Sequence, residues 1–130
     1  MRRVIVESPW AAESARQQSA HIDSLRAAVR DCLARGATPY ASPGLLTAVL
    51  DDAEPEQRAL GIDAGLAWGE VADATIVYID LGVTPGMQAG IDHANRHGRP
   101  VEYRRIRDIE TGELKPYPIT DPWALAADHP

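Results

Sequence analysis

Phenylalanine is missing from the chain, cysteine occurs once, and aromatic residues make up 5% of the 130 positions. Without Phe, the core must be built mainly from Val, Ile, Leu and Ala. The single cysteine, Cys32, excludes an intramolecular disulfide and a cysteine-based zinc site. We interpret it as a small, buried, apolar residue of the first long helix.

Clusters of basic residues and long apolar runs are also missing. The net charge is −6 at pH 7 without a basic block, which argues against a nucleic acid polymer as partner. A small anionic ligand needs only two or three local donors and remains compatible with this charge. No apolar run approaches the ~20 residues that span a bilayer. No secretory apolar segment follows Met1-Arg2-Arg3, so we expect a cytoplasmic protein with no membrane partner.

Three motifs of common enzyme classes are absent from the sequence. There is no Walker A motif, no Gly-x-Gly-x-x-Gly fingerprint and no Gly-x-Ser-x-Gly elbow. This weighs against an NTPase, a dinucleotide dehydrogenase and an α/β-hydrolase, and we expect no cofactor. His93 and His97 have the i, i+4 spacing of two metal ligands on a helix. Because the intervening residues do not match a zinc protease, we interpret the pair as solvated surface residues and expect no metal.

Strand and helix patterns alternate along the chain. Apolar runs predict strands at 3–7, 38–41, 75–79 and 101–105. Long helices are predicted at 22–33, 58–71 and 87–97, with a break at 42–44 and a short helix at 45–50. Such alternation predicts a parallel sheet with right-handed crossovers. We expect a flavodoxin-like three-layer α/β/α sandwich with strand order 2-1-3-4 at residues 1–106. An extended, proline-containing tail at 107–130 is expected to lie on a neighbouring subunit.

The stretch from Ala72 to Tyr103 carries the most information about function. It contains a strand, then a turn at 80–86 with a carboxylate, two glycines, a hydroxyl and a proline, then a helix and a strand. Open α/β sheets bind ligands at such turns, at the carboxyl ends of parallel strands. The N–H groups that begin the next helix can hold an anion. We predict a ligand site formed by Gly82, Thr84, Gly86 and Met87.

Three segments resemble a known enzyme superfamily. They are Glu7-Ser8-Pro9-Trp10, the helical segment from Leu50-Asp51-Asp52 to Trp68 with Arg58 and Gly61, and Thr84-Pro85-Gly86. Over roughly residues 3–105 the chain resembles the nucleoside 2-deoxyribosyltransferase and nucleotide N-glycosidase superfamily. More closely, it resembles a set of uncharacterised small proteins common in phages and actinobacteria. In the superfamily, the first segment is a Gly-Pro-aromatic turn under the sugar and base, and the third is a Ser-x-Gly pattern at the phosphate or sugar.

The chain departs from the superfamily at the catalytic residue. In the enzymes, a Glu six residues after that Ser attacks or stabilises the anomeric carbon, and the matching position here is Gly90. The resemblance therefore implies the fold and a small-nucleotide pocket, but not the catalytic Glu. It also implies a homodimer or higher homo-oligomer, because the superfamily builds its sites near subunit contacts. The apolar surface of the helix at 58–71 agrees with this, since we expect it to be buried between the sheet and another surface.

Cleavage of an N-glycosidic bond needs a carboxylate beside C1′. Glu7 and Asp80 are the catalytic candidates, because both end strands that are neighbours in the predicted sheet and would face one crevice. Two carboxylates in such a cleft raise one pKa and supply an acid and a base. Asp80 can instead hydrogen-bond the backbone of its own turn. Glu70 is a third candidate and can equally be a solvent-facing residue at a helix end.

Further ligand contacts are predicted at Ser8, Pro9, Trp10, Tyr40, Ser42 and Arg58. Trp10 can stack on a base, an interaction worth roughly 1–3 kcal/mol, or be a core or interface aromatic. The same choice holds for Tyr40. Arg58 can bind a phosphate through two hydrogen bonds or pair with Glu54 on the surface. Trp68 is expected in the core or at a dimer interface.

Three functions are compatible with these residues. The first is a small-nucleotide pocket that hydrolyses or transfers at the N-glycosidic bond of a (deoxy)nucleotide, with Glu7 or Asp80 as the carboxylate. The second is a catalytically silent module that senses or sequesters a nucleotide, which Gly90 favours. The third is a structural protein that uses an inherited fold.

Overall fold

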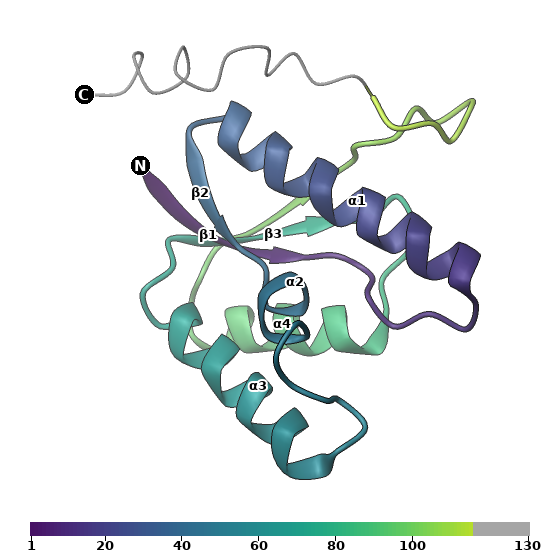
Figure 1. Ribbon diagram of the computed structural model, residues 1–130. Coiled ribbons are helices and arrows are strands. Elements are labelled where there is room, and N and C mark those ends of the chain that lie inside the picture. The colour runs from purple at the N-terminus through teal and green to yellow at the C-terminus, as the bar shows by residue number, and fades with distance from the viewer. Residues whose placement is uncertain (116–130) are drawn as a thin grey trace.

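A four-stranded, all-parallel sheet forms the centre of the molecule in this computed structural model, which describes residues 1–115 (Figure 1). Its strands are β1 (Arg2–Glu7), β2 (Ala37–Tyr40), β3 (Ala74–Tyr78) and β4 (Val101–Arg104). The order β2-β1-β3-β4 confirms the predicted order and the flavodoxin-like fold class. The carboxyl ends of β1 and β3, the two central strands, therefore lie side by side.

Helices lie on both sides of this sheet. They are α1 (Ala15–Ala34), α2 (Ser42–Leu46), α3 (Pro55–Gly69) and α4 (Pro85–Arg96). Helix α1 covers one face, and α4 covers the other, with α2 and α3 on the same side as α4 (Figure 1). Within residues 1–115, no helix combines the length and apolar character needed to cross a membrane. The predicted tail beyond residue 115 lies outside the described residues.

Capping residues explain where the helices begin. The side chain of Ser14 accepts a hydrogen bond from the Gln17 N–H, so α1 begins well before its amphipathic part. The predicted break at residues 42–44 is wrong, because α2 begins at Ser42. Proline fits the first turn of a helix, where its missing N–H costs nothing, and Pro43 begins α2 in this way.

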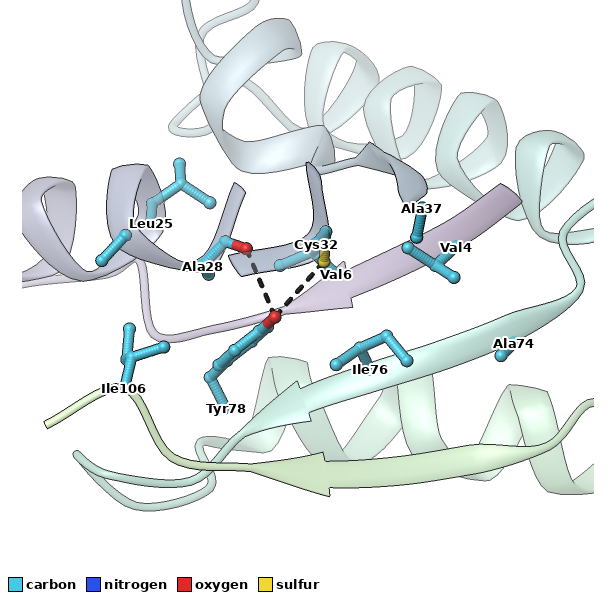
Figure 2. Packing of buried hydrophobic residues seen from close by; sticks show 11 residues of the cluster. Val4, Val6, Leu25, Ala28, Cys32, Ala37, Ala74, Ile76, Tyr78 and Ile106 are labelled. Carbon is cyan, nitrogen blue, oxygen red and sulfur yellow. Dashed lines mark hydrogen bonds between the residues drawn. The ribbon is translucent and has the colours of Figure 1, made fainter. Parts of the chain in front are cut away.

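The core divides into two layers because successive residues of β3 point to opposite faces of the sheet. Ile76 and Tyr78 face α1, whereas Val77 packs against Met87 and Ile91 of α4. Figure 2 shows the α1 layer, whose buried members within residues 1–115 are nine aliphatic side chains, Cys32 and Tyr78. This layer is built from Val, Leu, Ile and Ala, as the missing phenylalanine predicts.

One buried polar cluster fixes α1 on the sheet. The Tyr78 hydroxyl donates a 2.6 Å hydrogen bond to Asp31, whose carboxylate also accepts from Arg35 and Arg104. The thiol of Cys32 lies 3.3 Å from the same hydroxyl (Figure 2). Burial raises the pKa of Cys32, which keeps the thiol protonated and unreactive. Cys32 is therefore a core residue, as its interpretation from the sequence required.

Helix α3 is more exposed than the sequence predicted. Leu60 is 59% exposed, Ile62 52% and Trp68 53%, and Gly69 is the helix's buried residue. The predicted burial of this surface is therefore not provided by residues 1–115 of the same chain. Homo-oligomer formation stays a prediction. The exposed apolar side chains of α3 are the surface through which we expect it to occur.

We expect the chain to self-associate through the exposed apolar side chains of α3 around Leu60 and Trp68. Light scattering at micromolar concentration should give a mass above 14.1 kDa. Replacing Leu60 with Glu should shift the mass toward that of a monomer, because a buried charge opposes association. Ile109→Glu is the matched control, since Ile109 is 81% exposed outside α3. A monomeric wild-type chain would contradict the expectation.

Candidate functional site

A cavity of about 660 Å³ opens beside the carboxyl ends of β1 and β2 and the beginning of α4. Its walls come from the loop after β1, from α2 and α3, and from one face of α4. Most of the lining is apolar, with a few charged and hydroxyl groups. This volume and this lining are typical of small-molecule sites.

Nine of the predicted site residues line this cavity. They are Glu7, Ser8, Trp10, Tyr40, Ser42, Arg58, Thr84, Gly86 and Met87. Within residues 1–115, Pro9, Gly82 and Asp80 are not part of the lining. Glu70, the third carboxylate candidate, also lies outside it and lines a second, smaller hollow of about 400 Å³. The structure thus brings together loops that are far apart in the sequence.

Asp80 has backbone partners instead of a place in the cavity. Its carboxylate accepts hydrogen bonds from the N–H groups of Ile106, at 2.9 and 3.1 Å, and Arg107, at 2.9 Å. It therefore ties the end of β3 to the segment that follows β4. The sequence predicted that Glu7 and Asp80 would face one crevice, and the structure places only Glu7 there. The alternative of a backbone-bonded Asp80 is close to what is observed, although its partners lie on another segment rather than in its own turn.

The turn after β3 begins helix α4 in the predicted manner. Gly82 has φ +87°, a backbone conformation that side chains rarely adopt. Thr84 is the N-cap and accepts a 3.2 Å hydrogen bond from the Met87 N–H. With Thr84 and Gly86 in the cavity lining, the positive end of the α4 dipole lies at the cavity wall. An anionic group can be held there.

Glu7 lies against Gly90, the position at which the resemblance expects a catalytic Glu. A Cβ added to Gly90 would be 2.5 Å from the Glu7 carboxyl carbon and closer still to its Oε1. A side chain at position 90 would therefore displace this carboxylate from its present place. Strand β1 thus places a carboxylate at the α4 surface, beside the position at which the resemblance led us to expect one from the helix itself.

The Glu7 carboxyl group is shielded from water in this position. Burial raises its pKa from the usual 4.5 to about 7, and the positive charge of Arg99 opposes part of that rise. A carboxyl group with a pKa near 7 can either donate or accept a proton at neutral pH. Such a group is suited to acid–base or charge-stabilising chemistry in the cavity.

Arg99 lies beside Glu7 and is fixed by three neutral acceptors. Its guanidinium donates to Thr75 Oγ1 at 2.9 Å, to the Gly69 carbonyl at 2.7 Å and to His93 Nδ1 at 3.1 Å. A Cβ on Gly69 would be 3.2 Å from this guanidinium, so a glycine makes room here as well. Arg99 and His93 both line the cavity.

The aromatic residues Trp10 and Tyr40 line the cavity, whereas Trp68 lies outside the lining. Tyr40 stacks on Trp68 with ring centroids 5.3 Å apart and an interplanar angle of 28°. The Trp10 carbonyl accepts a 3.1 Å hydrogen bond from His21 Nδ1 of α1, which fixes the loop after β1. Trp10 also packs against the core layer of α1 while lining the cavity.

Sequence reasoning missed His93 and Arg99 as cavity residues. His93 was interpreted as a solvated surface residue, because its helical spacing from Met87 does not place it on the same stripe. Arg99 follows Gly98 in a connection and belongs to no motif. Neither residue carries a signal in the sequence, because their hydrogen bond joins a helix to the connection that follows it.

Comparisons with known proteins agree with this fold. The family described as "Domain of unknown function (DUF7768)" matches residues 2–104. The chain belongs to this family. A solved structure with a similar fold is a 2-deoxyribosyltransferase from the psychrotolerant bacterium Bacillus psychrosaccharolyticus, described as a biocatalyst for nucleoside synthesis. It is 19% identical, with a TM-score of 0.56, and the match covers 88% of this chain and 77% of that one. No curated protein matches the chain.

The similarity to that enzyme shows a distant relationship of fold. At 19% identity it transfers no residue role to this chain. The family's description names no activity. The chemistry of the cavity must therefore be argued from its own side chains.

The raised pKa of Glu7 predicts a pH-dependent difference between the wild type and Glu7→Gln. The folded state favours the protonated carboxyl of Glu7. The contribution of this group to the free energy of unfolding is therefore fully present below pH 4.5 and is lost as the pH rises through about 7. Relative to Glu7→Gln, the wild type should lose up to about 3 kcal/mol of unfolding free energy between pH 4.5 and pH 8. Urea unfolding across this range measures the difference. A constant difference would show that the Glu7 carboxyl is not desolvated.

The shared volume of Glu7 and Gly90 predicts an unfavourable effect of Gly90→Ala. We expect a loss of about 1–3 kcal/mol, because the new methyl group overpacks against the carboxylate. In a Glu7→Ala background the same change should cost nothing, which a double-mutant cycle measures. Gly86→Ala is the matched control on α4, since its Cβ would have only an ordinary 3.9 Å contact with Thr84 Oγ1. Equal effects of Gly90→Ala in both backgrounds would contradict the contact.

Proposed function

We propose that the cavity binds a small nucleotide or nucleoside and cleaves, or transfers at, its N-glycosidic bond. The observation that carries this proposal is the Glu7 carboxylate, desolvated in the cavity and lying against Gly90. The fold relationship to a 2-deoxyribosyltransferase supports the substrate class. No cofactor is part of the proposal.

The proposed reaction needs one carboxylate and one nucleophile that accepts the sugar, either water or a second base. The bond between C1′ and the base nitrogen breaks, and its electron pair leaves with the base, which takes up a proton. Ionised Glu7 stabilises the positive charge that develops at C1′. Water, or the nitrogen of a second base, then adds to C1′ and releases its proton, which gives hydrolysis or transfer. In this proposal, Glu7 acts at the sugar, and the positive end of the α4 dipole acts at its phosphate.

The remaining lining supports recognition of such a ligand. Thr84 and Gly86 begin α4, where a 5′-phosphate or a sugar hydroxyl finds a hydroxyl group and backbone N–H donors. Arg58 is exposed at the cavity margin and adds a positive charge for the same anion. The rings of Trp10 and Tyr40 offer faces for a base.

A catalytically silent nucleotide-binding module is the second candidate. Gly90 favours it, because this chain lacks a carboxylate at the position that the resemblance assigns to catalysis. The same cavity and the same binding residues would then sense or sequester the ligand. The two candidates differ only in whether Glu7 lies within reach of C1′ when the ligand is bound.

Release of free base tests the enzyme directly. Incubation with a panel of ribo- and deoxyribonucleotides, followed by chromatography, should show free base for at least one member. The rate should rise with pH through about 7, as Glu7 ionises. Glu7→Gln should abolish release, whereas Asp80→Asn should retain it, since Asp80 bonds only to backbone N–H groups.

Thermal unfolding with the same panel identifies the alternative. A raised midpoint without base release would support the silent module, because a ligand that binds only the folded state stabilises it. Neither release nor stabilisation by any member of the panel would contradict both candidates and leave the structural protein.

A further inference from the structure

His93 lines the same cavity as the Glu7 carboxyl and is carried by α4. The carboxyl occupies the space over Gly90, and His93 is three residues further along the same helix. Residues at i and i+3 lie on one helix face, with Cβ atoms about 5–6 Å apart. Both side chains line the cavity. A carboxyl and an imidazole therefore belong to one cavity, with Arg99 interacting with both.

Arg99 determines which nitrogen of His93 carries the proton. Its Nη2 lies 3.1 Å from His93 Nδ1, and a guanidinium can only donate. Nδ1 must therefore accept, so the ring is neutral and its proton is on Nε2. Arg99 is itself fixed by Thr75 and by the Gly69 carbonyl, in the space that Gly69 leaves open. No atom of residues 1–115 accepts a hydrogen bond from Nε2, which leaves this donor available at the cavity.

We propose that His93 is a ligand-binding residue that donates a hydrogen bond from Nε2 to an acceptor atom of the nucleotide, and that Arg99 positions it by fixing this tautomer. The ligand class in this inference rests on the proposed function. A neutral imidazole donates without adding charge. The site therefore contains one carboxyl that titrates near neutrality and one donor that does not.

The groups around His93 keep its ring neutral. Burial lowers its pKa, and the neighbouring His97, Arg99 and Arg96 lower it further, whereas Glu70 opposes them. His97 stacks on the ring with centroids 4.2 Å apart, and its Nδ1 donates to the His93 carbonyl. From β1, the Glu7 carboxyl also faces this region. The arginines and carboxyl groups named here are equal in number, so burial and the hydrogen bond from Arg99, rather than an excess of positive charge, hold the ring in its neutral donor form.

Nitrogen-15 spectra of the imidazole rings test the tautomer in the absence of any ligand. At pH 7, His93 should show an unprotonated Nδ1 and a protonated Nε2, with a titration midpoint below 6.5. In Arg99→Leu the midpoint should rise and the two tautomers should exchange. A protonated Nδ1 in the wild type, or equal midpoints in the two proteins, would overturn the positioning role of Arg99.

Two amide substitutions test the donor role. The side-chain amide of Gln reaches the position of Nε2, whereas that of Asn reaches the position of Nδ1. With dAMP, dGMP, dCMP and dTMP as probes, His93→Gln should bind within about twofold of the wild type, and His93→Asn about three- to tenfold more weakly, the range for one neutral hydrogen bond. Thermal midpoints without nucleotide show whether each variant folds.

The possible results separate this inference from the proposed function. Wild-type binding that is unchanged in His93→Ala would overturn the donor role and leave the proposed function intact. A wild type that binds none of the four probes would overturn both. Base release without any dependence on His93 would also reject the donor role while supporting Glu7.

Discussion

The contact between the end of β1 and the bare backbone of α4 at Gly90 is the constraint on which the site depends. It brings the Glu7 carboxylate to the helix surface, excludes water from it, and raises its pKa to about 7. Gly69, at the end of α3, likewise leaves space for the guanidinium of Arg99. Two glycines thus place an anion and a cation in one cavity, and the attraction between these charges moderates the cost of burying them.

The fold could be predicted from the sequence because its signals are local. The β-branched run of β3, the glycine after α1 and the Thr84 cap each specify an element without reference to the rest of the chain. Alternation of strands and helices then leaves few topologies. The error at residues 42–44 is also local, since proline can end a strand or begin a helix, and the sequence does not say which. The exposure of α3 was beyond prediction because it depends on which surfaces the other helices occupy.

The candidate site could be predicted only where it follows strand ends. Glu7 and Thr84 lie at the carboxyl ends of strands or immediately after them, and the parallel sheet brings these ends together. Asp80 follows the same rule and still fails to reach the cavity, because the backbone N–H groups of Ile106 and Arg107 bind it first. His93 and Arg99 are joined by a hydrogen bond across a helix–strand connection, and no spacing rule reports such a bond.

A steric exclusion also limits how such a cavity changes over generations. Residues 7 and 90 compete for one volume, so a side chain added at position 90 moves the Glu7 carboxyl from its present place. Substitutions at these two positions are therefore coupled through one shared volume.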